Sequence, residues 1–283
     1  METEFKKFTV HASPFNPDLI SSLMWELNIS GIEELENTLI IYSEPDSVSK
    51  SDLENMLAKL VKENILDTFS VAEDKVENKN WNEEWEKNLE IIEVTEKIVI
   101  KPTNKKYKPK ENQIIITIDP KMSFGTGRHQ TTKLMLILLE KYFNNPEKVL
   151  DVGTGTAILS IAAAKLGAKK VTGIDIDEWC FINGTENVRK NNVAGTVRIE
   201  KLEINKLNDN DFDLILANIN KNVLLSIKEE IKNKLKKNGL LILSGILNTD
   251  ESSIVQNFTD QQILDIEIYR MDEWSAIVFR KAN

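Results

Sequence analysis

Two hydrophobic periodicities alternate along the first 76 residues. Residues 5–12 (FKKFTVHA) have the pattern of a strand, and residues 16–28 place apolar side chains at the three- and four-residue spacing of a helix. Further segments follow with the patterns of a strand pair, a helix and a final strand, at 31–35, 37–44, 52–64 and 67–77. The order β-α-β-β-α-β predicts a ferredoxin-like α+β domain over residues 1–76.

From residue 113 onward, short apolar strands alternate with longer amphipathic segments. Strands are expected at 113–120, 148–152, 170–176, 197–201, 212–218 and 239–246. Helices are expected at 131–143, 157–167, 177–192 and about 221–237. This alternation predicts an α/β domain over residues 113–283 with a mostly parallel, Rossmann-like sheet. Residues 264–281 form two apolar runs around a short turn, which predicts an antiparallel C-terminal hairpin.

A polar segment, residues 77–112, joins the two patterned regions and is expected to be a linker. Trp81 and Trp85 stand four residues apart, as if packed on one face of a helical turn. The Lys97–Lys110 region is rich in lysine and contains one tyrosine. Such a cluster suits either contact with nucleic acid or a solvated hairpin tip, and the sequence leaves both open.

Composition is that of a soluble protein, with 41% hydrophobic and 29% charged residues. The sequence contains no run of about 18 apolar residues, so we expect no membrane span. The N-terminus lacks the apolar core of a secretory signal, and the single cysteine, Cys180, excludes an internal disulfide. We therefore expect a cytoplasmic protein, and the absence of a coiled-coil pattern favours a monomer.

Charge is distributed unevenly along the chain. Residues 1–80 contain 7 Lys and Arg against 16 Asp and Glu, so the whole net charge of −9 belongs to this quarter. An acidic domain can simply be well solvated, or it can guide and orient a basic partner. Composition alone does not decide between these two interpretations.

The most informative motif is the glycine-rich turn in VLDVGTGTA. The strand that ends here runs into Gly153 and Gly155, a helix follows at once, and Asp175 ends the next strand 22 positions after Gly153. Glycines allow close approach of a ligand to the helix N-terminus, and the later acid suits ribose hydroxyls.

Two ligands fit this description, and two residues separate them. A dinucleotide site prefers Gly or Ala at the position of Ile158, and Asp151 before the turn would repel a pyrophosphate. A carboxylate favours a ligand with an amino group and no phosphate, such as S-adenosylmethionine. We therefore predict a class I methyltransferase rather than a dehydrogenase, with Asp151, Gly153, Gly155 and Asp175 binding the cofactor.

The expected fourth strand of the sheet ends in DLILANINKNVLL, with Asn218 at its tip. Amino-group methyltransferases often carry an Asn or Asp here, followed by Pro-Pro-Tyr. This chain has the Asn without the Pro-Pro-Tyr, which argues against a planar base as substrate because no aromatic ring can stack on it. We predict that Asn218 is catalytic and also contacts the cofactor. The alternative is that it merely caps the following helix.

A second glycine-rich stretch, FGTGRHQTT at residues 124–132, precedes the cofactor turn. It lacks the Gly-Lys-Ser/Thr ending of a phosphate-binding loop. We expect a loop that covers the methionine end of the same ligand, with Thr132 at a helix start. His129 either accepts a proton during catalysis or holds the loop. The predicted cofactor contacts in this loop are Phe124, Gly125, Thr126 and Gly127.

The set DPKMSFGTGRHQTT, DVGTGTAILSIAAAKLGA, GIDID, ANINKNVLL and LSGIL resembles the ribosomal protein L-eleven methyltransferases. The resemblance covers roughly residues 77–283, with a less diagnostic acidic front domain. It implies cofactor binding at Thr132, Gly153, Asp175 and Asn218, with S-adenosylhomocysteine as the product. Arg128 stands where many members have a smaller residue, and it receives no role.

The resemblance further implies a protein N-methyltransferase whose front domain recognises a basic ribosomal protein, which suits the acidic charge. We expect no metal and no requirement for nucleic acid. Lysine side chains, an α-amino terminus or both are candidate targets. The alternatives are a methyltransferase acting on RNA or another protein, and a non-catalytic binding protein.

Overall fold

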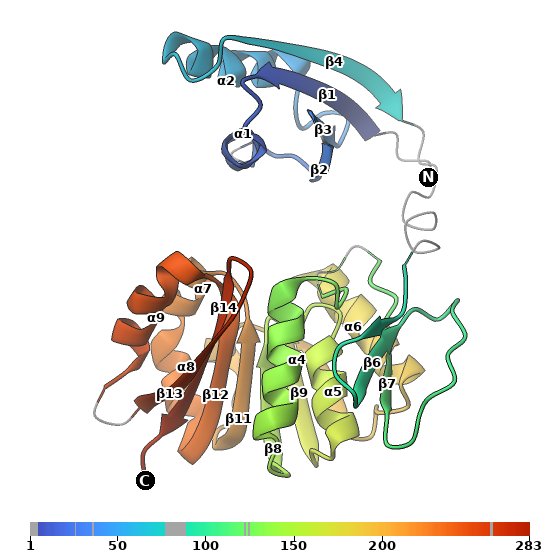
Figure 1. The fold of residues 1–283 in the computed structure, drawn as a ribbon, viewed down its shortest axis with the longest axis vertical. Helices are drawn as coiled ribbons and strands as arrows, with labels where there is room; N and C mark the ends of the chain where they lie inside the picture. The colour runs from blue at the N-terminus through green and yellow to red at the C-terminus, as the bar shows by residue number, and fades with distance from the viewer. Residues whose placement is uncertain are drawn as a thin grey trace. The chain divides into compact units, whose positions relative to one another are not determined.

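The structure is a computed structural model. It describes residues 5–25, 27–35, 37–76, 89–121, 123, 125–260 and 263–283. The chain divides into two compact units, Met1–Trp81 and Asn82–Asn283, and each is described by itself (Figure 1). Among the residues singled out above, Trp81, Trp85 and Phe124 lie outside the described part of the chain.

The first unit packs two helices on one four-stranded antiparallel sheet. Its elements are β1 (Phe5–Ser13), α1 (Pro17–Met24), β2 (Gly31–Leu35), β3 (Thr38–Ser43), α2 (Lys50–Lys62) and β4 (Thr68–Val76). The strand order is β2-β3-β1-β4, and fully buried Phe8, Val10 and Leu57 belong to the core of this unit. The predicted order of elements is confirmed. Helix α2 begins at a capping box, in which Ser49 and Asp52 bind each other's backbone N–H.

The second unit is built on a seven-stranded sheet with the order β10-β9-β8-β11-β12-β14-β13. The strands are β8 (Lys148–Val152), β9 (Lys170–Asp175), β10 (Val197–Lys201), β11 (Phe212–Asn218), β12 (Leu235–Leu247), β13 (Ile263–Met271) and β14 (Trp274–Lys281). Strands β8 to β12 pair in parallel, whereas β14 is antiparallel to both of its neighbours. The predicted Rossmann-like sheet with an antiparallel C-terminal hairpin is confirmed.

Helices and short helical turns cover both faces of this sheet. They are α4 (Gln130–Tyr142), α5 (Ile158–Leu166), α6 (Glu178–Lys190), η1 (Ile204–Lys206), α7 (Lys221–Ser226), α8 (Lys228–Lys234), η2 (Asn248–Asp250) and α9 (Glu251–Phe258). Leu214 and Leu216 face the core formed with α4 and α5, and Ile215 and Ala217 face the core formed with α7 to α9. Both faces of β11 are therefore buried, which explains its continuous apolar run.

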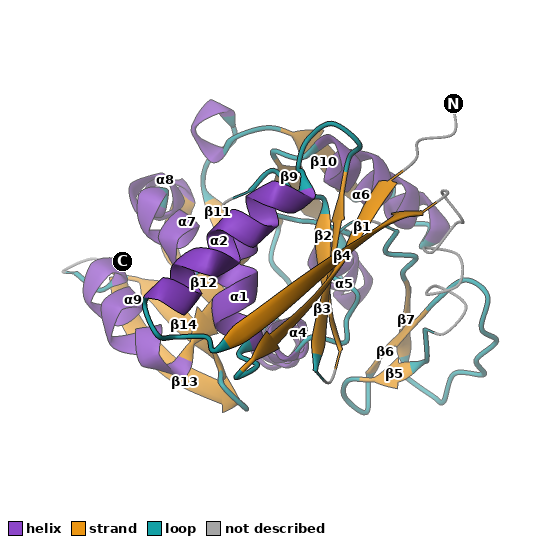
Figure 2. Cartoon of the chain, turned by 90° about the horizontal axis from the view of Figure 1, so that it is seen from above, coloured by secondary structure: helices purple, strands orange, loops and turns teal. Residues whose placement is uncertain are grey.

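A small three-stranded sheet lies beside the main one. It contains β5 (Ile92–Glu93), β6 (Ile98–Lys101) and β7 (Ile114–Thr117), and Figures 1 and 2 place it on the opposite side of the unit from β13. Buried Ile98 and Ile100 join the core under α4 and α5. Of the segment expected to be a linker, residues 77–88 lie outside the description, and the remainder includes β5 and β6.

The main sheet changes direction of winding between β8 and β11. These strands pair directly, with Val152 beside Ala217, whereas the chain leaves β8 for β9 on its other side. In sheets of this kind, ligands bind where the connections diverge, at the carboxyl ends of the strands. The turn after β8 and the tip of β11 therefore meet at the expected binding crevice.

One predicted helix differs from the structure. Residues 221–237 form two short helices, α7 and α8, that meet at Ile227, and the chain becomes extended from Leu235. Leu235 pairs with Phe212 of β11, so the sheet takes residues that the pattern assigned to the helix. None of the helices within the described ranges is long and apolar enough to span a membrane.

Candidate functional site

A cavity of about 750 Å³ opens at the carboxyl ends of β8, β9 and β11. It brings together most of the residues that the motifs singled out. These are Gly125, His129, Thr132, Gly153, Gly155, Asp175 and Asn218. Segments separated by more than 90 residues therefore line one site.

The turn after β8 has the left-handed backbone that its glycines permit. Gly153 has φ +70° and Gly155 has φ +53°, and helix α5 begins three residues later at Ile158. The N–H of Gly155 donates to Oδ2 of Asp175 over 2.9 Å. The acid that ends β9 is therefore joined to the turn, and both border the cavity.

Asp151 lies behind the turn and is not among the residues that line the cavity. Its carboxylate is buried, and its Oδ2 accepts hydrogen bonds from the hydroxyls of Thr154 (2.6 Å) and Ser160 (2.7 Å) and from the N–H of Ser160 (3.1 Å). Burial raises the pKa of Asp151. These contacts support the turn and the first residues of α5, and direct contact of Asp151 with a ligand stays a prediction.

Asn218 ends β11 and faces the cavity. The following helix, α7, is capped by Asn220, whose side chain accepts from the N–H of Val223 over 3.0 Å. The alternative assignment of Asn218 as the helix cap is therefore wrong by two residues. The Oδ1 atom of Asn218 is buried and has no hydrogen-bond partner in the described structure, so it is available to a ligand.

Ile219 is held between two glycines, Gly153 in the turn after β8 and Gly245 in β12. A Cβ on Gly153 would lie 2.4 Å from Cγ2 of Ile219, and a Cβ on Gly245 would lie 2.6 Å from its carbonyl oxygen. Gly245 has φ +83°, which L side chains rarely adopt. The sequence interpretation quoted Gly245 only within LSGIL and missed this role. A glycine inside a predicted strand was the available signal.

His129 is the N-cap of α4. Its Nδ1 lies 3.3 Å from the N–H of Thr131, from which it accepts, and 2.8 Å from the Thr131 hydroxyl. The ring packs edge-on against Trp274, with centroids 4.8 Å apart. Burial lowers the pKa of His129, so the ring is neutral near pH 7. One ring nitrogen is therefore engaged in holding the start of the helix.

Some of the other residues of the 124–132 loop line the cavity or a smaller hollow beside it, and one is buried away from both. Gly125 borders both the cavity and a smaller neighbouring hollow, which Thr126 and Arg128 also line. Gly127 is buried, and a Cβ there would lie 2.4 Å from Cδ1 of Ile100 on β6. The predicted contacts of Thr126 and Gly127 with the cofactor therefore concern residues that do not line the cavity.

The ionisable side chains of the cavity are acidic or neutral. Asp175, Glu203 and Glu230 line it, and no described lining residue is lysine or arginine. These carboxylates would repel a pyrophosphate, so the lining disfavours a dinucleotide. The three carboxylates suit a ligand with an ammonium and a sulfonium group, as in S-adenosylmethionine. The buried Oδ1 of Asn218 offers a further hydrogen-bond acceptor.

Comparison with known proteins agrees with this geometry. The family model for ribosomal protein L11 methyltransferase (PrmA) matches residues 27–282. A ribosomal protein L11 methyltransferase of Ruminiclostridium cellulolyticum is 40% identical over 208 residues, which cover 73% of this chain and 66%, just under two thirds, of that protein. Its namesake in Chlorobaculum tepidum is 37% identical over 277 residues, 93% of this chain and 95% of that protein.

A solved structure shows the same relationship. The crystal structure of a ribosomal protein L11 methylase from Lactobacillus delbrueckii subsp. bulgaricus has a TM-score of 0.64 at 32% identity, and the match covers 69% of this chain and all of that one. The strand order, the turn after β8 and the cavity define a class I methyltransferase. More particularly, the chain belongs to the ribosomal protein L11 methyltransferase family.

Proposed function

We propose that this protein transfers methyl groups from S-adenosylmethionine to amino groups of ribosomal protein L11. Lysine side chains, the α-amino terminus or both are the acceptors, and S-adenosylhomocysteine is the product. The family supports this assignment, because its relatives carry that name. The observation that carries it is the cavity at the carboxyl ends of β8, β9 and β11. Every charged side chain in its described lining is acidic.

The cofactor would be held by residues from several loops. Asp175 is suited to bind ribose hydroxyls: its Oδ2 accepts from the N–H of Gly155 and its Oδ1 from the N–H of Asp177, and each carboxylate oxygen can accept a further hydrogen bond. Gly153 and Gly155 allow close approach of the ligand, and Thr132 borders the same space. Bound S-adenosylmethionine would supply an electrophilic methyl group. Asp151 acts indirectly in this scheme, by fixing the turn.

The acceptor must be a neutral amine when it attacks. A lysine with a pKa of about 10.4 costs roughly 4–5 kcal/mol to deprotonate at pH 7, and an α-amino group costs about 1 kcal/mol. The Oδ1 atom of Asn218 is buried and lacks a partner, so it can accept a hydrogen bond from the amine and orient its lone pair. Catalysis then depends mainly on positioning and desolvation.

For His129 we propose the holding role rather than that of a proton acceptor. Its Nδ1 is engaged at the N-terminus of α4, and the ring is fixed against Trp274. A catalytic role for His129 as a proton acceptor stays a prediction that these contacts do not favour. The region around Asn218 would instead bind the amine that receives the methyl group.

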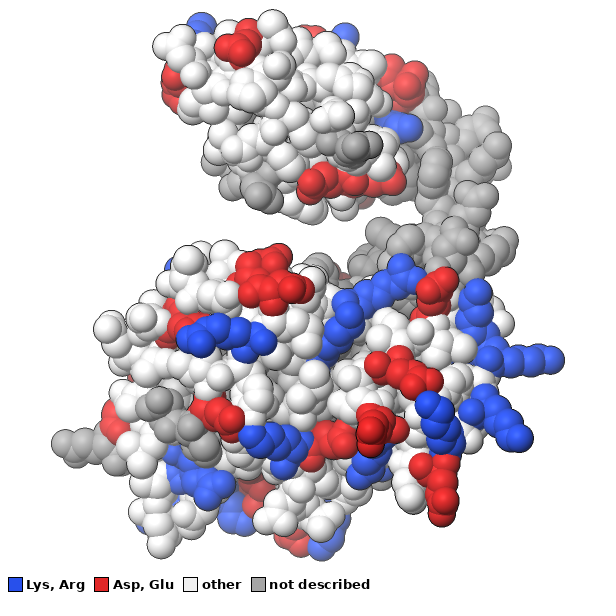
Figure 3. Space-filling model, in the orientation of Figure 1, with Lys and Arg blue, Asp and Glu red and all other residues white. Residues whose placement is uncertain are grey.

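Docking of the substrate is proposed for the first unit. This unit carries the net negative charge of the chain, and ribosomal proteins are basic because they bind RNA. On the face shown in Figure 3, the first unit carries acidic side chains with few basic ones, whereas the second carries both signs interspersed. An RNA substrate would need the opposite charge.

Replacing Asn218 tests the catalytic assignment. Asn218→Ala should lower kcat by about 100-fold and change the affinity for S-adenosylhomocysteine by less than about five-fold, because the lost acceptor serves the amine. Asn218→Asp keeps an acceptor oxygen at this place and should retain more activity than Asn218→Ala. Unchanged turnover in Asn218→Ala, measured with purified ribosomal protein L11 and labelled cofactor, would reject the assignment.

The same assay separates the competing functions. Labelled S-adenosylmethionine is incubated with ribosomal proteins and, separately, with ribosomal RNA. Label in ribosomal protein L11 is expected. Label in RNA alone would replace the proposal with an RNA methyltransferase, and label in neither would favour a binding protein.

A further inference from the structure

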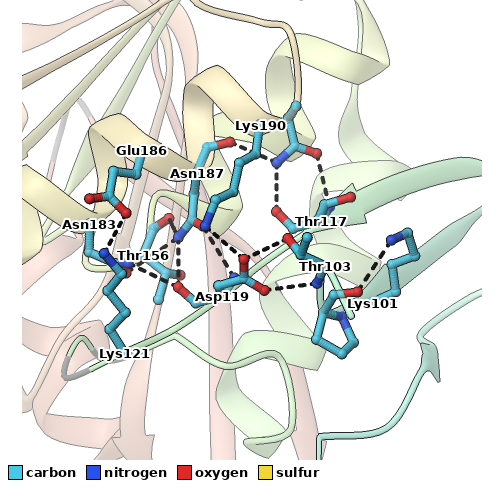
Figure 4. Close-up of polar contacts among 12 residues, drawn as sticks. Lys101, Thr103, Thr117, Asp119, Lys121, Thr156, Asn183, Glu186, Asn187 and Lys190 are labelled. Carbon is cyan, nitrogen blue, oxygen red and sulfur yellow. Dashed lines mark hydrogen bonds and ion pairs between the residues drawn. The ribbon is translucent and has the colours of Figure 1, made fainter. Parts of the chain in front are cut away.

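Helix α6 presents three asparagines to the start of the loop that ends at α4. Asn183, Asn187 and Asn191 are spaced by four residues, so they lie on one face of the helix and its C-cap. All three are buried, with at most 5% exposed. Figure 4 shows Asn183 and Asn187 facing Asp119, where the loop begins after β7. Buried amides of this kind are retained only where every bond is satisfied.

The amides bind the backbone of this segment rather than its side chains. Asn191 accepts from the N–H of Thr117 (2.9 Å) and donates to its carbonyl (2.6 Å), as a neighbouring strand would. Asn187 accepts from the N–H of Asp119 (3.2 Å), and Asn183 donates to the carbonyl of the same residue (2.9 Å). The entry to the loop is therefore fixed to α6.

The Asp119 side chain adds a second attachment. Its carboxylate accepts from the N–H and hydroxyl of Thr103, at 2.8 and 2.5 Å, and from Nζ of Lys190, at 2.7 Å. Lys190 is the last residue of α6, and Thr103 follows β6. The end of β7 is thus held from both sides before the chain turns toward the cavity (Figure 4).

Asn187 also reaches the cofactor turn, through Thr156. Its Nδ2 donates to the carbonyl of Thr156 over 3.1 Å. The hydroxyl of Thr156 in turn donates to the carbonyl of Gly125 over 2.7 Å. Thr156 is fully buried, and Gly125 borders the cavity from the opposite loop. One threonine therefore joins the turn after β8 to the loop before α4.

Gly125 has no room for a side chain at this junction. Gly125 has φ +104°, and a Cβ there would lie 2.7 Å from the Thr156 hydroxyl oxygen. A side chain at residue 125 would thus displace the hydroxyl from its acceptor. The two glycine-rich stretches approach each other closely only because one has no side chain and the other has a hydroxyl.

We propose that Thr156 is a positioning residue whose hydroxyl fixes the Gly125 backbone at the wall of the cavity and couples it to α6 through Asn187. The inference rests on the proposed function, because it assigns this wall to the methyl donor. Thr156 acts through Gly125 and need not touch the reacting atoms. Loss of the hydroxyl is expected to loosen residues 125–129 in the folded protein and to lower turnover.

Three variants of the full chain test the inference. Thr156→Val keeps the branched shape and removes the hydroxyl, whereas Thr156→Ser keeps the hydroxyl and removes the methyl group. Thr172→Val is the matched control, because Thr172 is 1% exposed, lies in β9 of the same sheet and has a hydroxyl oxygen without a hydrogen-bond partner. It belongs to neither the cavity lining nor the loop.

The first readout is hydrogen exchange of the amides of residues 125–129, with and without S-adenosylhomocysteine. Thr156→Val should exchange about ten-fold faster than the unmodified protein, the effect of losing one buried hydrogen bond. Thr156→Ser and Thr172→Val should match the unmodified protein within about two-fold. Equal exchange in Thr156→Val and Thr172→Val, or equally fast exchange in Thr156→Ser and Thr156→Val, would overturn the inference.

The second readout is the kinetics of methyl transfer to ribosomal protein L11. Thr156→Val should lower kcat by about ten-fold while KM for the protein substrate stays within about two-fold, and Thr156→Ser should restore kcat. Because a loss of folded enzyme would also lower the apparent kcat at unchanged KM, each rate is expressed per mole of folded protein, measured by circular dichroism, and Thr172→Val controls for the loss of a buried threonine hydroxyl. Binding of S-adenosylhomocysteine to the unmodified protein, measured by calorimetry, tests the proposed function separately: without it the site is not a cofactor site, whatever the exchange shows.

Discussion

Cys180 shows how the position of one side chain controls its chemistry. The thiol lines the cavity near the start of α6, and burial, reinforced by the nearby charges of Asp175 and Asp177, raises its pKa to about 11. A thiol is nucleophilic only as the thiolate, so this cysteine should be unreactive at neutral pH. The lone cysteine of the sequence is accordingly interpreted as a structural residue.

Alkylation of Cys180 gives a test at the scale of one residue. The pKa is raised from an ordinary value of 9.0, so at pH 8 the folded protein should hold about 100-fold less thiolate than the unfolded chain. The rate of reaction with iodoacetamide should rise with pH toward an inflection near 11 and should fall further with S-adenosylhomocysteine bound. An inflection near pH 8–9 in the folded protein would contradict the burial argument, and urea-unfolded protein is the control.

Asp151 provides a second test at this scale, on stability. Asp151→Ala removes the acceptor shared by the hydroxyls of Thr154 and Ser160 and the N–H of Ser160, and only one of the two hydroxyls, which lie 3.2 Å apart, can donate to the other. The two buried donors left unsatisfied should lower the free energy of unfolding by about 3 kcal/mol. Asp151→Asn keeps one acceptor oxygen and should cost about 1 kcal/mol. Urea denaturation measures both. Similar losses in the two variants would mean that the carboxylate does not serve as this acceptor.

At the scale of strands and turns, the contacts of Ile219 fix how the end of β11 lies against the cofactor turn. The segment that follows β11 passes between Gly153 of the cofactor turn and Gly245 of β12, with no space for a side chain on either glycine. The position of Asn218 is thus set by its neighbour Ile219, whose side chain lies against Gly153 and whose backbone lies against Gly245. The contact at Gly245 does not depend on a side-chain rotamer, so it holds the segment rigidly.

Gly245→Ala tests this contact. The new Cβ would lie 2.6 Å from the Ile219 carbonyl oxygen, and the residue has φ +83°, so we expect a loss of about 2–3 kcal/mol in stability and at least a ten-fold lower kcat. Gly195→Ala is the matched control, because nothing lies within 4 Å of a Cβ there and its φ is not in the left-handed region. Equal activity in both variants would show that Ile219 moves without consequence.

These contacts also mark how far the sequence could predict the site. The turn at Gly153 and the acid at Asp175 were predictable because strand, turn and helix are local and the spacing follows from the fold. Gly245 packs on Ile219, 26 residues away, and Thr156 binds Gly125, 31 residues away, and no periodicity records such contacts.

Helix boundaries failed for a related reason. Both Asn218 and Asn220 are good N-cap residues by type, and only the end of β11 decides that Asn220 is the cap. Residues 235–237 have a helical pattern in isolation, yet pairing of Leu235 with Phe212 makes them the start of β12. Tertiary pairing overrode the local preference at both places.

The distribution of charge belongs to the scale of the whole molecule. A net charge of −9 in residues 1–80 beside an electrically balanced remainder predicts that association with a basic protein is sensitive to salt. The measurable consequence is in KM for the protein substrate, since cofactor binding and kcat depend on the second unit.

Charge reversal tests this docking. Glu34 and Glu73 are exposed in the first unit, and Glu90 and Glu111 are exposed in the second. The double variant Glu34→Lys, Glu73→Lys should raise KM for ribosomal protein L11 about five-fold or more at low salt and leave kcat unchanged. The control Glu90→Lys, Glu111→Lys makes the same change in net charge and should alter KM by less than two-fold. A control as impaired as the first variant would leave net charge, not the first unit, as the cause.

The close contacts of Ile219 with Gly153 and Gly245 also determine where related proteins can diverge. Substitutions of Val223, which lines the cavity and is 41% exposed, can reshape the opening for a different acceptor without altering the contacts of Ile219 with the two glycines. Changes at Gly153 or Gly245 displace the segment itself. Substrate range can therefore drift in evolution, or be redesigned, while the geometry of the transfer step is inherited intact.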